Sequence, residues 1–434
     1  MVMMSKKTNV WTILCALLVW VSFTSATVRA SEEYPYPYKD PFLATFSSAL
    51  LKGRNKKQGV RSDVLKVWVL PDRDSFSRIE GRGYLSCRLY VQKDKKAPLM
   101  IIIPGLGSSA HFGNGTFLAD QFYLKGFHVL VVPSPMNWNF ALAASESGLT
   151  GVTPSDVGDL QRALRIALKT LREEESLQIG NIGVVGISLG GLEAGFLSVL
   201  EKNQPALGIS RYLAINPAVD LKHGIVTLDR LSQMESEIGG PDRARSIRKW
   251  AMEQLSDTIM DGDPTDPEYF SNVDKRYPFT HEEFQFLLGT FIKAPISESI
   301  YISQLIEDRG ILKEDPSKMR ARIKEAATFS AMEYVEKVVY PHFAERATGT
   351  PFTVDELMAR SSLPYLEKNL KEQNQFYVME NQDDFLLRSG DLDWLRSVFG
   401  SHLKVYPLGG HVGNIWFDQN KRDILALFAD WVAE

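Results

Sequence analysis

Residues 182–200 contain the stretch that decides the fold. An apolar, β-rich run from Ile182 to Val185 leads into residues 186–191, Gly-Ile-Ser-Leu-Gly-Gly, and a helical pattern continues from Leu189 to Leu200. A Gly-x-Ser-x-Gly turn between a strand and a helix is a nucleophile elbow, a turn so tight that the serine needs small neighbours on both sides. The bare pentapeptide is weak evidence, so its position between strand and helix matters most. Ser188 is therefore the candidate nucleophile.

A serine hydroxyl is a poor nucleophile at neutral pH and needs a base, which we sought among the seven histidines of the chain. His411 fits best, because it follows the strand-like run Leu403–Tyr406 through a turn with two glycines and comes after Ser188 in the chain. The others precede the serine, begin or precede a strand, or lie in a long helical segment: His111, His128, His223, His281, His342 and His402.

The third member of such a triad is a carboxylate that orients the imidazole, and we expect it in the loop after the preceding strand. Asp383 and Asp384 both lie in that loop. We favour Asp384, because it stands three residues after Asn381, where such loops turn the acid inward. Asp383 and Glu380 remain as alternatives.

Backbone N–H groups are expected to stabilise the charge that develops on a substrate carbonyl oxygen. The run ending at Ile103 continues into residues 104–109, Pro-Gly-Leu-Gly-Ser-Ser. This loop is suited to aim the Leu106 amide at the oxyanion, and the Leu189 amide supplies a second donor. The alternative is that the glycines only make a turn.

Strand-like and helical runs alternate through most of the chain, which predicts an α/β protein with a mostly parallel sheet. The expected strands are 64–70, 83–91, 98–103, 128–132, 182–185, 211–215, 376–379 and 403–406, the first two antiparallel at one edge. The expected helices are 116–125, 157–171, 189–200 and 420–432.

The alternation stops between residues 221 and 372, where helical periodicity, charges and glycine-proline breakers predict a helical insertion. We divide the chain into a signal peptide (1–30), an N-terminal extension with one helix (31–63), a first core part (64–220), the insertion (221–372) and a second core part (373–434). The extension's helix is expected to begin at Asp40 and end at Gly53.

Together these motifs resemble the α/β-hydrolase superfamily over 64–219 and 375–434, with the insertion where the superfamily carries its cap. The Pro-Gly-Leu-Gly loop, the elbow and residues 409–414, Gly-Gly-His-Val-Gly-Asn, look like those of bacterial carboxylesterases. The resemblance implies a sheet with helices on both faces and a helical cap. One departure is Pro104, which stands where many members have His before the oxyanion glycine.

The first thirty residues have the order of a secretory signal peptide: Lys6 and Lys7, an apolar run from Val10 to Phe23, then small residues. Cleavage after Ala30 or Ala26 predicts an exported, periplasmic or secreted protein. Export would remove Cys15 and leave Cys87 alone, so no intrachain disulfide is expected.

The partners expected are small acyl esters or amides. Loss of the three basic residues of the signal changes the formal charge from −4 to −7, which argues against nucleic-acid binding. No pattern indicates a metal or another cofactor. Trp138, in the loop 135–140, is our candidate for substrate binding, although a packed surface loop fits as well. The apolar stretch from Phe284 to Ile306 fits either cap packing or a lining for acyl chains, with peripheral lipid contact through the cap.

Ester hydrolysis through an acyl-enzyme is the leading functional hypothesis. An aminopeptidase or amidase of the same fold is the second. A binding protein on a hydrolase scaffold is the non-catalytic alternative, and it is disfavoured because every role in the triad has a candidate.

Overall fold

The computed structural model describes residues 34–49, 60–75, 83–250, 279–347 and 351–432. Within them, eight strands form one sheet in the order β1-β2-β4-β3-β5-β6-β7-β8. The strands are β1 (Asp63–Val67), β2 (Leu85–Tyr90), β3 (Lys96–Ile103), β4 (His128–Val131), β5 (Gln178–Ile187), β6 (Ile209–Ile215), β7 (Phe376–Asn381) and β8 (Leu403–Tyr406).

The sheet is parallel except at one edge, where β2 pairs antiparallel with both β1 and β4. The antiparallel opening strands are therefore confirmed. From β4 to β8 the strands are parallel, so the loops that follow β3, β5, β6, β7 and β8 emerge at one edge of the sheet. Each candidate site residue predicted in a loop after a strand is thus brought to the same side of the molecule.

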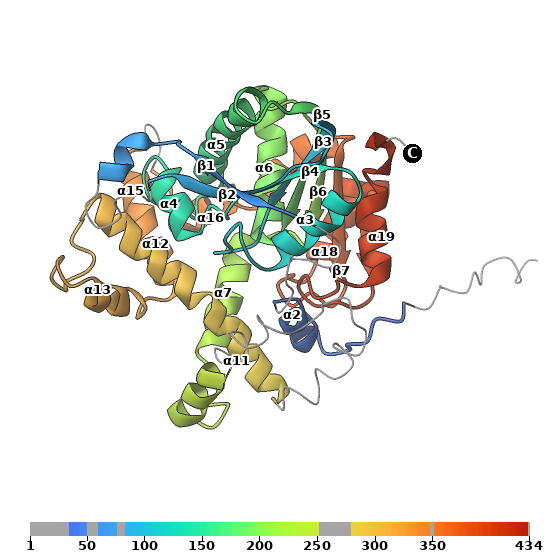
Figure 1. The fold of residues 1–434 in the computed structure, drawn as a ribbon. Helices are drawn as coiled ribbons and strands as arrows, with labels where there is room; N and C mark the ends of the chain where they lie inside the picture. Colours follow the sequence, from blue (N-terminus) through green and yellow to red (C-terminus); the bar gives the residue numbers. More distant parts are fainter. Residues whose placement is uncertain (1–33, 50–59, 76–82, 251–278, 348–350, 433–434) are drawn as a thin grey trace, which may run out of the picture. The chain divides into compact units, whose positions relative to one another are not determined.

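Helices cover both faces of the sheet, as the resemblance to the α/β-hydrolase superfamily implied. Along the strand order of the sheet, the connection from β3 to β4 runs toward β1, whereas those from β4 to β5 and from β5 to β6 run toward β8. Because such crossovers are right-handed, connections that run in opposite directions place their helices on opposite faces of the sheet. The helices outside the insertion are α2 (Pro41–Ala49), α3 (Asn114–Leu124), α4 (Trp138–Ala143), α5 (Thr153–Glu173), α6 (Leu189–Asn203), α18 (Asp391–Phe399) and α19 (Asp418–Ala426). Figure 1 shows them around the sheet.

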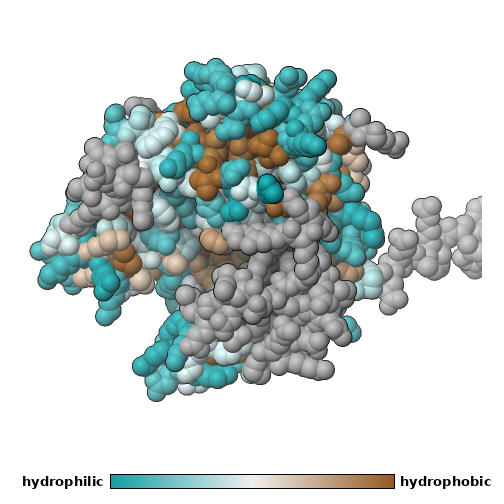
Figure 2. All heavy atoms as spheres, viewed as in Figure 1, coloured by the Kyte–Doolittle hydropathy of each residue, from teal (hydrophilic) through white to brown (hydrophobic). Residues whose placement is uncertain are grey.

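The chain between β6 and β7 is helical, and we call residues 221–372 the cap. Its helices are α7 (Leu221–Ser232), α11 (His281–Phe291), α12 (Lys293–Ile306), α13 (Met319–Ala326), α14 (Ala331–Tyr334), the π-helical turn η3 (Val335–Val339), α15 (Tyr340–Glu345), α16 (Val354–Arg360), the 3-10 turn η4 (Leu363–Leu366) and α17 (Glu367–Lys371). In Figure 1, α7, α11, α12 and α13 gather away from the sheet. The outer surface of this part is mostly hydrophilic in the view of Figure 2, with scattered apolar residues.

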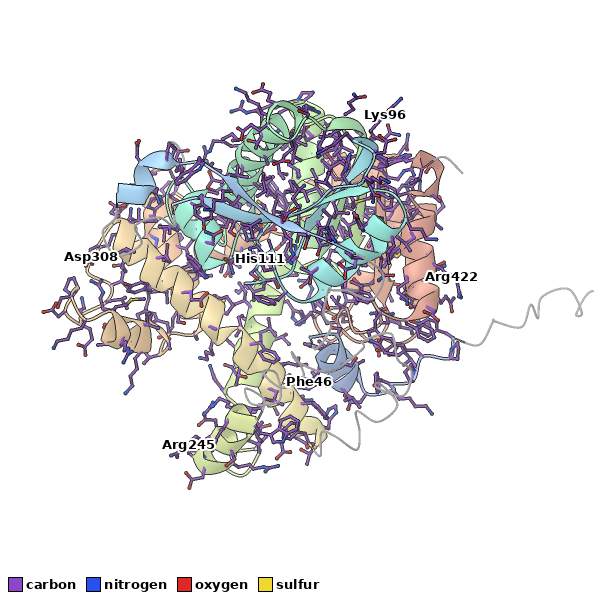
Figure 3. All side chains as sticks on the ribbon, in the orientation of Figure 1. Phe46, Lys96, His111, Arg245, Asp308 and Arg422 are labelled. Carbon is purple, nitrogen blue, oxygen red and sulfur yellow. The ribbon has the colours of Figure 1, made fainter. Side chains whose placement is uncertain are left out.

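Helix α2 of the N-terminal extension packs against the cap. Asp40 caps it as predicted, since its Oδ1 accepts hydrogen bonds from the Phe42 and Leu43 N–H groups at 2.8 and 2.9 Å. Phe46 lies where α2 meets α11, with its ring centroid 5.5 Å from that of Phe284 (Figure 3). The predicted helix end at Gly53 lies outside the described residues, as does the predicted signal peptide. No helix among the described residues is long and apolar enough to cross a membrane.

Two local expectations were wrong. The predicted loop 135–140 turns into helix α4 at Trp138, because the Asn137 side chain accepts the Asn139 N–H at 3.0 Å and caps the helix. The predicted C-terminal helix 420–432 is interrupted, since α19 ends at Ala426 and a short 3-10 turn (Ala429–Trp431) follows.

Candidate active site

The turn from β5 into α6 is as tight as the sequence predicted. Ser188 stands between the two elements with φ 56° and ψ −119°, a left-handed conformation that is strained for a residue other than glycine. A Cβ on Gly186 would lie 2.1 Å from the Gly190 carbonyl oxygen, and one on Gly190 would lie 2.1 Å from the Ile103 carbonyl oxygen. Both glycines are therefore required for this backbone to close.

His411 lies in the loop after β8 and faces the serine. Its Nε2 atom is 2.7 Å from Ser188 Oγ, within hydrogen-bond distance. The other six histidines are placed elsewhere; His111, for example, contacts Ser86, and His402 contacts the Phe376 carbonyl. The structure thus brings together the two residues that the chain order paired.

Asp384 lies on the far side of the imidazole, with its Oδ2 atom 2.8 Å from His411 Nδ1. The carboxylate is buried and accepts two further hydrogen bonds, from Asn216 Nδ2 at 3.0 Å and from the Leu386 N–H at 2.9 Å. With these contacts, Asp384 favours the imidazole tautomer that carries its proton on Nδ1 and leaves Nε2 free to accept the serine proton.

The serine follows β5, the aspartate follows β7 and the histidine follows β8, on a mostly parallel sheet with the cap inserted between β6 and β7. The chain has the α/β-hydrolase fold. No protein-family model matches the sequence, and no curated protein is similar to it in sequence.

Several solved structures are similar to this chain. The esterase Pf2001 of Pyrococcus furiosus is 12% identical, with a TM-score of 0.41 over 88% of this chain and 96% of the other. An esterase of Pyrobaculum calidifontis is 14% identical, with a TM-score of 0.39 over 90% of each chain. The carboxylesterase EstE1, cloned from a metagenomic library, is 13% identical, with a TM-score of 0.41 over 90% and 93%. The fold is assigned from the strand order and from the loops after β5, β7 and β8, which carry Ser188, Asp384 and His411.

The two alternative acids have other contacts. Asp383 accepts hydrogen bonds from the N–H groups of Gly409 and Gly410, at 3.2 and 2.9 Å, so it holds the backbone of the histidine loop rather than the ring. Glu380 is fully buried behind Asp384, and Asn216 Nδ2 bonds both carboxyl groups. Burial and the neighbouring Asp384 raise the pKa of Glu380 well above its usual range.

The predicted oxyanion donors flank the serine. Leu106 lies in the loop after β3, and its neighbour Gly105 is so close to the elbow that an added Cβ would lie 3.2 Å from Ser188 Cβ. Leu189 is the first residue of α6, and the first N–H groups of a helix have no partner within the helix. Both residues therefore lie next to Ser188, as the predicted oxyanion site requires.

Two cavities meet at Ser188. The first, which we call the open cleft, is about 310 Å³ in volume and is lined by both Ser188 and His411, with Thr45 and Ser48 of α2 and Phe291 of the cap. The second, which we call the apolar pocket, is narrower, about 80 Å³, and includes Ser188 but not His411. Five residues line both cavities: Leu106, Ser188, Leu228, Ile292 and Leu386.

Trp138 is the one predicted site residue that the structure does not bring to Ser188. Since α4 begins at this residue, its side chain packs against a cluster made of Ala141 and Leu142 of α4 and Tyr301 and Ile302 of the cap, and it lines a separate cavity beside His111. Met136, two residues earlier, lines the apolar pocket instead.

The N-terminal extension, with Tyr36 and helix α2, contributes contacts to the site that the sequence did not reveal. The His411 N–H donates to Thr45 Oγ1 at 2.8 Å, and the Tyr36 hydroxyl donates to the Gly413 carbonyl at 2.9 Å. The helix also presses directly on the loop, because a Cβ on Gly410 would lie 2.0 Å from the Pro41 carbonyl oxygen. Neither Thr45 nor Tyr36 belongs to a motif, so only the fold discloses their roles.

A polar network joins the acid loop to the histidine loop. Asn381 Nδ2 donates to the Gly410 carbonyl at 2.8 Å, and Asn414 Nδ2 donates to Asn381 Oδ1 at 2.6 Å. These buried amides fix the separation of the two loops that carry Asp384 and His411. Among the described residues, no group of three or more His, Cys, Asp or Glu side chains is arranged to hold a metal ion.

Proposed function

We propose that this protein is an exported serine esterase, which cleaves carboxylic esters through Ser188, His411 and Asp384. The observation that carries the proposal is the unbroken chain of two hydrogen bonds, 2.7 Å from Ser188 Oγ to His411 Nε2 and 2.8 Å from His411 Nδ1 to Asp384 Oδ2. A serine, a base and an orienting acid in this geometry are the parts of a nucleophilic acyl-transfer site.

Acylation begins when Ser188 Oγ attacks the ester carbonyl carbon and His411 Nε2 takes the hydroxyl proton. The resulting imidazolium is stabilised by the Asp384 carboxylate beside Nδ1. The carbonyl oxygen becomes an anion that accepts hydrogen bonds from the Leu106 and Leu189 N–H groups. The tetrahedral intermediate then collapses, the bond to the alcohol oxygen breaks, and His411 returns its proton to the departing alcohol.

Deacylation repeats these steps with water as the nucleophile. His411 Nε2 takes a proton from a water molecule, whose oxygen attacks the acyl carbon bound to Ser188. The second tetrahedral intermediate collapses, the carboxylic acid leaves, and Ser188 Oγ recovers its proton from His411. In this proposal the water enters through the open cleft, because that cleft is lined by both His411 and Ser188.

The first experiment separates an enzyme from a binding protein and an esterase from an amidase. A fluorophosphonate probe should label the wild-type protein and should not label Ser188→Ala. Alkyl esters of graded chain length and aminoacyl anilides are then compared as substrates. Higher kcat/KM on the esters supports the esterase; cleavage of the anilides alone would establish the amidase, and failure to label would establish a non-catalytic protein.

Kinetic non-additivity tests whether the residues act as a unit. Replacing Ser188 or His411 by Ala should each lower kcat by a factor on the order of 10⁴–10⁶, and the double variant should lose little more than either single one. Ser188→Ala should also leave the free energy of unfolding unchanged or slightly higher than that of the wild type, because residues at strained active-site positions are commonly kept at a cost in stability. Additive losses would show that the two side chains do not share one mechanism.

Export is a separate part of the proposal and is supported by the order of residues 1–30 in the sequence. Protein made in its native host should begin at Ser31, or at Thr27 if cleavage follows Ala26. A mature protein that still begins near Met1 would refute cleavage.

A further inference from the structure

The apolar pocket leads from Ser188 between the core and the cap. Its walls come mainly from aliphatic side chains of the cap, including Leu221, Ile225 and Ile296. It contains the serine and Leu106 but not His411, whereas the open cleft contains all three. Because His411 must return its proton to the leaving alcohol, the alcohol occupies the open cleft. The apolar pocket is therefore on the acyl side of the scissile bond.

One carboxyl group interrupts this lining. Asp156, on the first turn of α5, lines the apolar pocket and is only 3% exposed. Its Oδ2 atom accepts the Gly151 N–H at 2.7 Å, while Oδ1 has no hydrogen-bond partner among the described residues. A buried carboxylate oxygen without a donor costs free energy, so this position calls for a partner from outside the chain.

The other polar groups of the pocket cannot supply that partner. The Tyr334 hydroxyl donates to the Thr150 carbonyl at 2.6 Å, and the Thr153 hydroxyl donates to the Ser361 carbonyl at 2.8 Å. Each hydroxyl has one proton to donate, and each proton is already engaged. The acceptor on Asp156 is thus left for a donor that arrives with the substrate.

A second carboxyl group stands behind the first. Glu193 on α6 is 1% exposed, and neither of its carboxyl oxygens has a partner among the described residues. Burial and the charge of Asp156 raise the pKa of Glu193 well above its usual range, and burial also raises that of Asp156. No lysine, arginine or histidine in the described part of the chain contributes to either shift. The two carboxyl groups are thus buried together without a cation, and a cation bound beside Asp156 would offset the cost of ionising it there.

We propose that the apolar pocket binds an acyl group that carries a primary amine, with the ammonium against Asp156 Oδ1. This inference rests on the proposed esterase activity. The pocket lacks a positive charge and a hydrogen-bond donor for Asp156 Oδ1. An ammonium group supplies both, since it is charged and has three N–H donors. A hydroxyl supplies one donor and no charge, and a methyl group leaves Oδ1 unpaired. The aliphatic walls contact the methylene chain between the ester and the amine.

The selectivity should be large, because a site built to bind a polar group discriminates strongly against the analogue that lacks it. An uncharged acyl chain of the same length fills the walls but leaves the carboxyl pair without a cation. We expect kcat/KM for the amine-bearing ester to exceed that of its alkyl counterpart by about tenfold or more at the best chain length.

The test uses matched pairs of methyl esters, ω-aminoalkanoates against alkanoates with the same number of heavy atoms, over increasing chain length, with methanol release as the readout. The wild type should prefer the amine at one length. Asp156→Asn should abolish or reverse that preference, measured as the ratio of kcat/KM for the two esters of each pair. Asp159→Asn is the matched control, because Asp159 lies one turn along α5, pairs with Arg162 and does not line the pocket.

Glu193→Gln is a second variant that leaves the Asp156–Gly151 hydrogen bond in place, and it should reduce the preference for the amine. A wild type that favours the alkanoate at every chain length would overturn the inference. An unchanged preference for the amine in a folded Asp156→Asn variant would also overturn it. If Asp156→Asn does not fold, an unchanged preference in Glu193→Gln has the same meaning. Hydrolysis of the plain alkanoates and fluorophosphonate labelling report on the proposed function by itself. If both fail, the esterase proposal fails; if both succeed without amine selectivity, only this inference fails.

Discussion

The backbone N–H of His411 donates a hydrogen bond to Thr45 Oγ1 at 2.8 Å, although 366 positions separate the two residues. The same hydroxyl donates to the Pro41 carbonyl at 2.7 Å, so its proton and one of its lone pairs are both engaged. Thr45 therefore fixes the backbone of the histidine loop to α2. A helix outside the sheet thus helps to position the candidate base.

Thr45→Val keeps the shape of the side chain but removes the acceptor for the His411 N–H. We expect kcat to fall by about tenfold with a smaller change in KM, because a small displacement of the imidazole weakens proton transfer more than substrate binding. Thr45→Ser restores the hydroxyl and should recover most of kcat. Ester kinetics on both variants, with thermal unfolding as a check on folding, make the measurement. Equal kcat for the Val and Ser variants would mean that the hydrogen bond does not position the base.

The adjacent aspartates should differ sharply in their effect on turnover. Asp384→Asn replaces the acid that contacts His411 Nδ1 and favours the wrong tautomer, so kcat should fall by a factor on the order of 10⁴. Asp383→Asn retains one carbonyl oxygen for the N–H groups of Gly409 and Gly410, and its kcat should fall far less. Single-turnover acylation rates of the two variants make the comparison. Equal decreases in the acylation rate would mean that Asp383 acts on the imidazole of His411, contrary to its observed contacts with the backbone of Gly409 and Gly410.

Glu380→Gln should make the protein more resistant to alkaline pH. Burial raises the pKa of Glu380, so the folded protein retains a proton that the unfolded chain releases above its ordinary pKa, about 4.3. The unfolded state then binds fewer protons, and the free energy of unfolding of the wild type falls as pH rises from that value. Glutamine has no such proton, so the stability of the variant relative to the wild type should increase with pH.

Denaturant unfolding from pH 4 to pH 9 measures this difference. Turnover should change little, because the glutamine carbonyl still accepts from Asn216 and its amide still donates toward Asp384. Glu380→Leu is the contrasting variant, since it removes both interactions and should lower kcat. A stability difference between Gln and Glu that does not vary with pH would show that Glu380 ionises normally in the folded state.

The close packing of α11 against the end of α7 in the cap requires a glycine at position 289. A Cβ on Gly289 of α11 would lie 2.2 Å from the Ser232 backbone nitrogen at the end of α7. Gly289→Ala should therefore force the helices apart and lower the free energy of unfolding by about 1–3 kcal/mol. Gly224→Ala on α7 is the control, since nothing lies within 4 Å of its added Cβ. That variant should be neutral or slightly stabilised, by up to about 1 kcal/mol, because alanine favours helix.

The sequence was most informative where local chemistry and local geometry coincide. The elbow at Ser188 was predictable because a strand, two obligatory glycines and a helix are adjacent in the chain. The alternation of strands and helices gave the parallel sheet, since apolar runs such as Ile101 to Ile103 are buried on both faces. The helix α4 was missed because its six residues are too few to show a helical period.

Contacts between distant segments were beyond sequence reasoning. Asn216, Asn381 and Thr45 belong to no pattern, yet they fix the acid and histidine loops through hydrogen bonds to residues far along the chain. Trp138 was expected beside the substrate, and only the fold shows that α4 turns it toward the cap.

The sequence by itself determined the candidate nucleophile, its order relative to the candidate base and the sheet that carries both, because backbone sterics and hydrophobic periodicity act between neighbours in the chain. It favoured Asp384 as the acid but left two alternatives, Asp383 in the same loop and Glu380 in the strand before it. Only the tertiary structure decided that Asp384 contacts the imidazole while Asp383 binds two backbone N–H groups. It alone decided that Asp156 and Glu193 lie buried together without a cation. The physical reason is that hydrogen bonds and buried charges depend on distance in space, and the packing of the loops, α2 and the cap sets that distance.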